Sequence, residues 1–271
     1  MKAQPSIAGK PDFPWWLVAA GVIAVACAAM IALSGLYAQV FSIVARGIGI
    51  TIFVTVVGFT VASAIGLGVA LMALSGSIWL RQIARFYVEI IRGVPILVLL
   101  FWIAFAGVPA FVALWNWLVV PLRDAGLVGE LAVRDVSLLA RAIMALTIGY
   151  SAFIAEIFRA GIQSVDGGQV EAAKALGLSR LQRFRLIVFP QAIRTILPPL
   201  GNDFVAMVKD SSLVSVLGVA DITQMGKVYA AGTFRFFETY SIVAYIYLIL
   251  TVSLSLALRA LERRMRKGVH P

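Results

Sequence analysis

The stretch Glu171-Ala-Ala-Lys-Ala-Leu-Gly177 is followed by Leu-Ser-Arg and, ten residues past the glycine, by Ile187-Val-Phe-Pro190. It is a polar, basic segment of good helix formers, and it lies between stretches that are apolar enough to cross a bilayer. A structured polar loop between two membrane spans is suited to contact another protein. The stretch therefore predicts both a membrane protein and a docking site within it.

The composition of the chain indicates its solvent. Apolar residues make up 61% of the 271 residues, charged residues only 13%, and the mean hydropathy is +0.96. A soluble domain carries about 25% charged residues, so most of this chain must face lipid or other buried helices. No polar stretch is long enough to fold as a separate soluble domain. We therefore expect one all-α, polytopic membrane domain.

Six apolar stretches are long enough to be transmembrane helices, since about 20 apolar residues cross the hydrocarbon core. The predicted spans are residues 15–36, 44–74, 94–117, 138–160, 194–219 and 239–258. The second is longer than one crossing needs, so it should tilt or extend beyond the membrane. Its glycines would let a neighbouring helix approach closely; they stand at positions 47, 49, 58, 66 and 68.

Arginine and lysine residues predict the orientation. The net charge is +10 and the pI is about 10.2. The positive charges cluster in short loops beside apolar stretches rather than on one amphipathic face, so a nucleic-acid partner is not expected. With the N-terminus inside, sixteen of the 23 lie on the cytoplasmic side, six lie on the opposite side, and Lys209 lies within a span. This asymmetry predicts that both termini and the loop 161–193 are cytoplasmic.

The predicted organisation has four parts. Residues 1–14 form a cytoplasmic N-terminal tail, and residues 15–43 form an additional transmembrane helix with an external loop. Residues 44–258 form the transmembrane core with the loop 161–193, and residues 259–271 form a basic cytoplasmic tail. The first apolar stretch indicates a span rather than a cleaved signal, because it lacks a clear A-x-A exit and has about 20 residues.

Local rules predict the shape of the loop 161–193. Val170 to Leu176 should form a helix that Gly177 ends in the left-handed αL conformation. Ser179-Arg-Leu-Gln182 fits a capping box that starts a second short helix. The predicted result is two short helices that meet in a sharp turn at Gly177.

The same loop has features that suit a docking partner. Ala172 and Ala173 are small enough to let a partner's surface approach closely, and Glu171 offers it a charge. Phe189-Pro190 sets the entry to the next span, because a proline restricts the residue before it. The alternative interpretation is an ordinary alanine-rich loop between two helices.

Further motifs occur from about Gly47 to Arg259. They are Arg92-Gly-Val-Pro95, Ala155-Glu-Ile-Phe-Arg-Ala-Gly-Ile162, Gln163-Ser-Val165 with Gly168-Gln169, Leu197-Pro-Pro-Leu-Gly-Asn202, and Lys209-Asp-Ser-Ser-Leu-Val-Ser-Val216. Together with the opening stretch, in this order and spacing, they resemble ABC importer permeases of the polar-amino-acid subfamily. Residues 161–193 then correspond to the family's EAA loop. The chain departs from the family pattern at Val94, Phe153, Asp166 and Asp203, where threonine, tyrosine, proline and glutamate are more common.

The resemblance implies a type I ABC importer permease fold, to which the span 15–36 is an addition. It implies that separate ABC ATPase subunits grip the EAA loop, through the coupling residues Glu171, Ala172, Ala173, Gly177 and Pro190. It also implies a homologous or identical permease subunit, an extracytoplasmic substrate-binding protein and a polar amino acid as substrate. The expected location is the bacterial plasma (inner) membrane.

The chain offers little for catalysis. Its one histidine, His270, lies in the C-terminal tail, and its one cysteine, Cys27, lies in an apolar stretch. No cluster of cysteine and histidine has metal-ligand spacing. No lysine is followed by serine or threonine, so the ATP-binding motif GxxxxGK[ST] is absent. We therefore expect no enzyme and no cofactor in this chain, with ATP and Mg²⁺ bound by the partner ATPase.

Charged residues inside spans, with their neighbours, are the candidate substrate pathway, because a charge at the centre of a span costs at least about 2.5 kcal/mol. The candidates are Arg92, Phe153, Glu156, Asn202, Asp203, Lys209, Asp210 and Ser211. Pro198 and Pro199 are expected to break the helix near Asn202 and to expose its ends to a ligand. An amino acid carries an ammonium and a carboxylate group, so a pathway with both charge signs suits it. The alternatives are structural ion pairs, of Glu156 with Arg159 or Arg92, and of Asp203 with Lys209.

The stretch 118–137 is predicted to lie outside the membrane. Trp115 and Trp117 precede it and are expected to anchor the span at the interface. Arg123, Glu130 and Asp135 are among its mixed charges, which predict a solvated loop. A surface for a substrate-binding protein is the alternative.

The sequence thus predicts a transmembrane permease subunit of an ATP-driven ABC importer for polar amino acids. It would form the translocation pathway and couple to a separate ATPase through the EAA loop. One alternative is an ion-coupled secondary amino-acid transporter, with Glu156, Asp203 or Asp210 as the ion site. Another is a membrane scaffold whose loop only recruits a partner.

Overall fold

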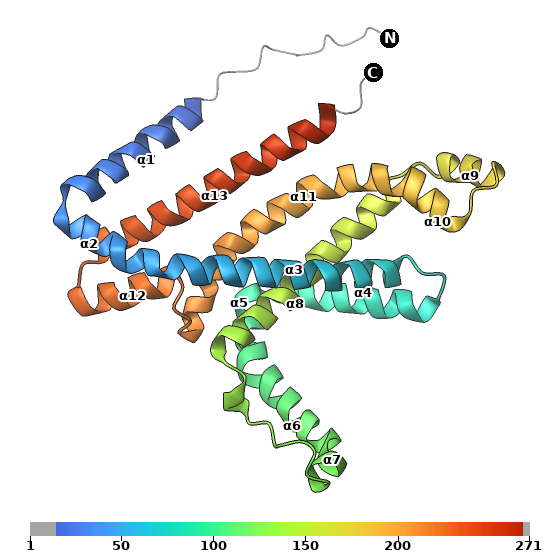
Figure 1. The fold of residues 1–271 in the computed structure, drawn as a ribbon, viewed down its shortest axis with the longest axis horizontal. Helices are drawn as coiled ribbons and strands as arrows, with labels where there is room; N and C mark the ends of the chain where they lie inside the picture. The colour runs from blue at the N-terminus through green and yellow to red at the C-terminus, as the bar shows by residue number, and fades with distance from the viewer. Residues whose placement is uncertain (1–14, 268–271) are drawn as a thin grey trace.

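The computed structural model describes residues 15–267, with side chains from residue 15 to residue 263, and all regular elements in this range are helical (Figure 1). The long helices are α1 (Trp15–Leu33), α3 (Ile48–Ala73), α8 (Leu138–Gln163), α11 (Phe189–Asp210) and α13 (Phe236–Lys267). The shorter ones are α2 (Gly35–Val44), α4 (Ile78–Gly93), α5 (Ile96–Trp102), α6 (Val108–Leu118), α7 (Val120–Asp124), α9 (Gly167–Ala175), α10 (Arg180–Arg183) and α12 (Ile222–Thr233). Segments η1 (Ala45–Gly47), η3 (Val133–Asp135) and η5 (Ser211–Leu217) are 3₁₀-helices, and η2 (Ile103–Gly107) and η4 (Phe184–Val188) are π-helices.

Two predicted segments fall partly or wholly outside this range. The N-terminal tail 1–14 lies outside the described residues, as do the last four residues of the predicted tail 259–271. His270 is among the latter.

Five described stretches have the length and composition to cross a membrane: Trp15–Leu33, Gly35–Ala73, Ile96–Leu118, Leu138–Gln163 and Phe236–Arg263. The fifth predicted span, 194–219, is wrong in its bounds. Helix α11 starts at Phe189 and ends at Asp210, and a 3₁₀ segment follows it to Leu217. In that segment the hydroxyls of Ser211 and Ser215 donate to backbone carbonyls three residues earlier. Such side-chain bonds compete with regular helix geometry.

The predicted external loop at residues 37–43 is also wrong. Residues 35–73 form one nearly continuous helical run through α2, η1 and α3. Only Ser34, with an extended backbone (φ −112°, ψ 115°), separates this run from α1. No proline interrupts the stretch, so the helix continues.

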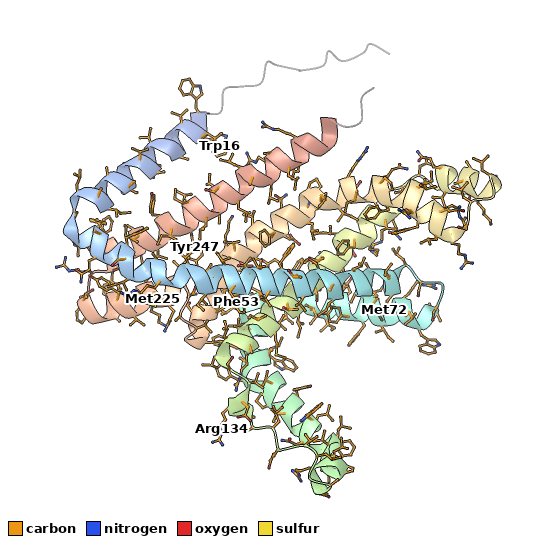
Figure 2. All side chains as sticks on the ribbon, in the orientation of Figure 1. Trp16, Phe53, Met72, Arg134, Met225 and Tyr247 are labelled. Carbon is orange, nitrogen blue, oxygen red and sulfur yellow. The ribbon has the colours of Figure 1, made fainter. Side chains whose placement is uncertain are left out.

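Helix α1 lies at the edge of the molecule and has no buried residue. Near its start, the Arg259 guanidinium of α13 lies 5.5 Å from the centre of the Trp16 ring (Figure 2). A guanidinium at this distance is attracted to the face of an indole. The contact therefore joins the first and the last described helices.

Residues 75–93 are predicted to be a cytoplasmic loop, but they contain the 16-residue helix α4. This helix packs along α3 and α8 and buries Ala84 and Val88 (Figure 1). At Val94-Pro95 the backbone becomes extended, because a proline disfavours the helical conformation of the residue before it. Helix α5 then starts in a new direction.

The main core lies where α3 packs against α8 (Figure 1). Its fully buried side chains include Val54 of α3, Leu100 of α5, Leu146 of α8 and Met207 of α11. Gly66 permits this close contact, since a Cβ on it would lie 2.9 Å from the backbone oxygen of Ser151. Gly68 on the same helix faces open space.

A second, smaller core joins α2, α12 and α13. The buried carboxylate of Asp221 caps α12 by accepting from the Gln224 N–H at 2.8 Å. The Tyr247 hydroxyl of α13 donates to the other oxygen of Asp221 at 3.1 Å (Figure 2). One buried acid thus fixes the position of α12 relative to α13.

We expect Gly66→Val to destabilise the protein, because the new side chain would meet the backbone of α8. Overpacking of this kind costs about 1–3 kcal/mol. Gly68→Val is the matched control, because it adds the same side chain to the same helix where nothing lies within 4 Å. Thermal unfolding in detergent measures both. The midpoint should fall only for Gly66→Val, and equal midpoints would contradict the packing of α3 on α8.

Candidate functional site

Helix α9 of the EAA loop begins and ends with strong local caps. At its start, an Asp166 side-chain oxygen accepts from the Gly168 N–H at 2.6 Å and from the Gln169 N–H at 3.4 Å. At its end, Gly177 has a φ of +80°, as predicted. The N–H of Gly177 bonds to the Lys174 carbonyl at 3.0 Å, and that of Leu178 to the Ala173 carbonyl at 3.1 Å. This is the Schellman arrangement, which ends a helix and turns the chain sharply.

The second helix of the loop starts with the predicted capping box. The Ser179 N–H donates to the Gln182 Oε1 at 2.8 Å, and the Gln182 N–H donates to the Ser179 Oγ at 3.4 Å. Helix α10 then runs through the π-helix η4 into α11, with Pro190 in the first turn of α11. Pro190 removes one backbone N–H from this continuous helical run, and the π-helical turn just before it is a local adjustment that can accommodate the loss. The two short helices meeting at Gly177 are therefore confirmed.

The EAA loop is joined firmly to the helices that carry it. The Gln191 side chain of α11 donates to the Gln169 side chain of α9 at 2.7 Å. Below the loop, Gly161 of α8 lies against Ile196 of α11, so closely that a Cβ would come within 2.2 Å. A displacement of the loop must therefore move α8 and α11 as well.

The exposed surface of the EAA loop differs in one respect from the prediction. Glu171 and Ala172 are exposed, but Ala173 is only 4% exposed and packs inside its own chain. The small size of Ala173 thus serves internal packing, which corrects its predicted role toward a partner. Leu176 and Leu181, on either side of Gly177, are 80% and 74% exposed. Large apolar side chains exposed together on a polar loop mark an interaction site.

A cavity of about 510 Å³ lies where the junction of α4 and α5 meets α8 and α11. Its size is typical of a site for a small molecule. The polar and aromatic residues in its wall are Arg92, Tyr150, Phe153, Asp203 and Asp210. Most of the remaining wall is apolar, with Ile91, Val94, Ile96, Leu99 and Ala206.

The charged groups of this cavity are unequally satisfied. The Tyr150 hydroxyl donates to the Asp210 Oδ2 at 2.8 Å. The Oδ2 of Asp203 is shielded from solvent and has no hydrogen-bond partner among the described residues. The Arg92 guanidinium lies 5.3 Å from the centre of the Phe153 ring. The cavity wall therefore contains one cation and two carboxylates, and the shielded oxygen of Asp203 has no partner among the described residues.

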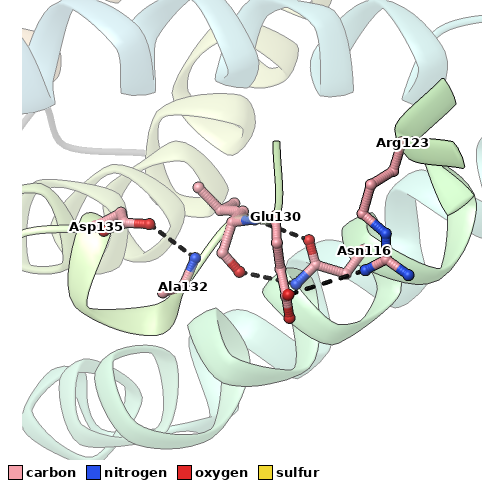
Figure 3. Close-up of polar contacts among 6 residues, drawn as sticks. Asn116, Arg123, Glu130, Ala132 and Asp135 are labelled. Atoms are coloured by element: carbon pink, nitrogen blue, oxygen red, sulfur yellow. Dashed lines mark hydrogen bonds and ion pairs between the residues drawn. The ribbon is translucent and has the colours of Figure 1, made fainter. Parts of the chain in front are cut away.

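At the end of the molecule away from the EAA loop, the end of α6, α7 and the stretch before α8 make up residues 118–137. Hydrogen bonds and an ion pair hold this loop together (Figure 3). The Asn116 side chain donates to the Leu131 carbonyl at 2.8 Å and accepts from the Leu131 N–H at 3.0 Å. Arg123 and Glu130 pair at 4.0 Å, and the Ala132 N–H donates to Asp135 at 2.8 Å. The predicted solvated loop 118–137 is thus partly helical and internally bonded.

Residues 62–267 match the family described as the binding-protein-dependent transport system inner membrane component. The chain belongs to this family. It is therefore a membrane-embedded permease subunit of an ABC importer, as the EAA motif and the polar cavity indicated. The ion-coupled secondary transporter is not supported. The family match begins inside α3, so α1 and α2 lie outside it.

Curated relatives agree with this family. The permease is 37% identical over 221 residues to the glutamine transport system permease protein GlnP of Escherichia coli (strain K12), covering 82% of this chain and 92% of that protein. It is 36% identical over 227 residues to the probable amino-acid permease protein YxeN of Bacillus subtilis (strain 168), covering 84% and 93%.

Solved structures share the fold. A structure described as an amino acid ABC transporter with histidines matches with a TM-score of 0.68 and 37% identity, over 84% of this chain and 95% of that one. An inward-facing MetNI methionine ABC transporter matches with a TM-score of 0.62 at 22% identity, over 82% of this chain and 96% of that one, which shows the fold alone. The type I permease fold predicted from the sequence is therefore confirmed.

The predicted pathway residues of the permease fall into three groups. Arg92, Phe153, Asp203 and Asp210 line the 510 Å³ cavity together. Glu156 lines a second cavity and pairs with Arg159, whose Nε lies 2.9 Å from its carboxylate. The other three line neither cavity: Asn202 and Lys209 are exposed on α11, and the buried Ser211 donates to the Val208 carbonyl at 2.7 Å.

Two structural expectations about α11 are wrong. The helix is not broken at Pro198 and Pro199 but continues through both to Asp210. The ends of a broken helix are therefore not what faces the cavity. Asp203 and Lys209 do not form an ion pair either, since the ion pairs among the described side chains are Arg123 with Glu130 and Arg159 with Glu156. Six residues of helix turn them to different faces, because a turn takes about 3.6 residues.

Tyr150, Leu176 and Leu181 are not among the site residues predicted from the sequence. Tyr150 lies one helical turn before Phe153, on the face that reaches the cavity. Helical spacing from Phe153 was a usable signal for it. Leu176 and Leu181 flank the predicted turn at Gly177, and leucines on both sides of that turn were a usable signal. No group of three or more potential metal ligands occurs in the described part of the permease.

We expect Gly177→Ala to loosen the turn of the EAA loop, because a side chain in the left-handed region costs about 1–2 kcal/mol. Amide hydrogen exchange across residues 167–183 should become roughly five- to thirtyfold faster, since exchange there reports local opening. Gly167→Ala is the control, because Gly167 has no positive φ and nothing within 4 Å of an added Cβ. Unchanged exchange in Gly177→Ala would contradict the cap.

Proposed function

We propose that this permease carries a polar amino acid through the cavity lined by Arg92, Asp203 and Asp210, driven by ATP hydrolysis on separate subunits. The observation that carries the proposal is the combination of both charge signs in one cavity. The similarity to permeases named for glutamine and other amino acids supports the same substrate class.

The charges of the cavity match the charges of a free amino acid. Its carboxylate would bind to the Arg92 guanidinium, which lies against the Phe153 ring and forms no ion pair within 4.0 Å among the described side chains. Its ammonium would bind to Asp203 and Asp210, and the free Oδ2 of Asp203 would gain the partner that it lacks. Charge-assisted hydrogen bonds of this kind are roughly twice as strong as neutral ones. The apolar part of the wall would contact the side chain of the substrate.

The proposed orientation places both termini and the EAA loop in the cytoplasm of a bacterium, where ATP is available. The excess of arginine and lysine on that side supports it. Two ATPase subunits would bind the EAA loops of the importer, holding ATP and Mg²⁺ themselves. Leu176, Leu181, Glu171 and Ala172 are the exposed groups that they would contact.

The proposed assembly also needs one partner outside the cytoplasm and another beside the permease in the membrane. An extracytoplasmic substrate-binding protein would dock near the loop 118–137, because its internal hydrogen bonds give it a fixed surface. A second permease, identical or homologous, would complete the pathway. No nucleic acid is involved, and the exposed apolar helices face lipid.

The proposed mechanism follows from the stiffness of the loop. When the ATPases close, they would push α9 and α10 as one unit, because the turn at Gly177 is doubly bonded. The unit would move α8 and α11, which contact each other at Gly161 and Ile196. Both helices line the cavity, through Phe153 on one and Asp203 and Asp210 on the other. The same movement would therefore change access to the bound amino acid.

Asp203→Asn and Asp210→Asn should each reduce amino-acid uptake about tenfold to hundredfold, because a hydrogen bond to a charged group contributes about 1.5–3 kcal/mol. The assay is uptake of labelled amino acids into proteoliposomes that hold the permease, its ATPase and its binding protein. Glu262→Gln on α13 is the control, because it removes a carboxylate that does not line this cavity. Full uptake in both aspartate variants would contradict the proposed site.

Leu181→Asp should weaken binding of the ATPase, since it places a charge in a contact built on apolar side chains. Co-purification of the tagged permease with its ATPase measures this. Leu127→Asp is the matched control, because Leu127 is 72% exposed but lies in the loop at the opposite end of the permease. If Leu181→Asp and Glu171→Lys both retained the ATPase and full transport, the proposed docking surface would be wrong.

A further inference from the structure

A second cavity, of about 640 Å³, lies between α4 and the last turns of α8, next to the EAA loop. Five of its lining residues are charged: Arg81, Arg85, Glu89, Glu156 and Arg159. It is distinct from the first cavity, because no lining residue is shared between the two. The proposed transport site gives this second cavity no role.

Three of the five charged side chains are already bound within the protein. The Arg81 guanidinium donates to the carbonyls of Ser75 and Gly76, both at 2.9 Å, and so holds the turn between α3 and α4. The Arg159 guanidinium pairs with the carboxylate of Glu156 and donates to the side chain of Gln163. These groups shape the cavity rather than offer it free charge.

The other two charged side chains, Arg85 and Glu89, are not bound in this way. They stand one turn apart on α4, a spacing at which opposite charges can pair, less favourably when the cation precedes the anion. Yet neither takes part in any ion pair or side-chain hydrogen bond within the described residues. A cation and an anion thus face the same cavity without neutralising each other. A ligand with both charges would satisfy the two groups at once.

The distribution of apolar and charged residues around α4 indicates that Arg85 and Glu89 face the cavity. One stripe of the helix is apolar and exposed, with Trp79, Ile83, Phe86 and Ile90. In a membrane-embedded protein, such an exposed apolar stripe is suited to contact lipid. The charged stripe lies on another face, at positions 81, 85, 89 and 92. Since a charge is costly in hydrocarbon, this stripe must face an aqueous cavity or protein.

The charged stripe also connects the two cavities. Glu89 lines the second cavity, and Arg92, one turn further along α4, lines the first. The direction from Arg92 to Arg81 leads from the first cavity toward the end of the molecule that carries the EAA loop (Figure 1). An amino acid released from Arg92 would meet Glu89 and Arg85 next.

We propose that the cavity between α4 and α8 is a second binding site for the zwitterionic amino acid, an exit site in which Arg85 holds the carboxylate and Glu89 the ammonium group. This inference rests on the proposed function, since it takes the substrate class and the direction of transport from it. It adds a second position at which the permease binds its substrate before release. The two sites would be occupied in sequence.

The test uses a reporter cysteine that leaves both charged groups in place. Ala73 lines the cavity, so Ala73→Cys is made in a Cys27→Ser background, and Gln163→Cys, at an exposed position of the same lining, is the second reporter. A charged methanethiosulfonate labels the nucleotide-free complex of permease and ATPase in nanodiscs. L-glutamine and L-histidine are the probes, each added in turn. Gly76→Cys, in the adjacent turn outside the cavity lining, is the control.

The amino acid that the complex imports should slow labelling of the reporters by roughly tenfold at ten times its dissociation constant, because occupancy reduces the free fraction in proportion to [L]/Kd. Labelling of Gly76→Cys should not change. Arg85→Gln and Glu89→Gln should abolish the protection, while Asp203→Asn in the first cavity should leave it intact.

Several outcomes would overturn the exit site. Protection that is absent at both reporters, or that survives Arg85→Gln and Glu89→Gln, would exclude it. Labelling that is slow without amino acid only when the nanodiscs contain phosphatidylethanolamine would assign the cavity to a lipid headgroup with the same two charges. Labelling that is slow under all conditions would assign it to a contact with the second permease.

Uptake by the wild-type complex separates the two proposals. Uptake without reporter protection rejects only the exit site, and no uptake of any amino acid rejects the proposed function.

Discussion

The cost of placing a charge in hydrocarbon is the constraint on which the rest of this structure depends. Helices α4, α8 and α11 all carry ionisable residues in an otherwise apolar protein. Each helix can avoid that cost only by turning its charged face toward the others or toward water. The two cavities are the result, one around Arg92 and Asp203 and the other around Arg85 and Glu89. The polar pathway and the packing of the bundle therefore have the same cause.

The EAA loop acts on this bundle through a short, stiff connection. Its two helices are held by local caps at Asp166, Gly177 and Ser179, so the loop has one shape. The bond of Gln169 to Gln191 and the contact of Gly161 with Ile196 then join that shape to α8 and α11. Because these helices also line the first cavity, the proposed docking of the ATPases would be mechanically linked to substrate access.

The loop was predictable because its bonds join residues that lie within five positions of each other. The left-handed Gly177 and the reciprocal Ser179 and Gln182 bonds follow from residue type and spacing alone. Helix α4 was missed, although its charged and apolar residues alternate with helical period, because its charges lower the hydropathy that identifies a span. The predicted break at Pro198 failed since neighbouring helices can support a helix that lacks one bond.

The sequence by itself determined that this is an integral membrane protein, the approximate position of most stretches that are long and apolar enough to cross a membrane, and that one polar loop is bent at Gly177. Composition and local spacing contain that information, because hydropathy and caps are properties of neighbouring residues. Only the tertiary structure decided which charges share a cavity, that Ala173 is buried, and that Arg85 and Glu89 stay unpaired. Those facts depend on how each helix is rotated about its own axis. That rotation is determined by contacts such as Gly66 with Ser151, between residues far apart in the chain.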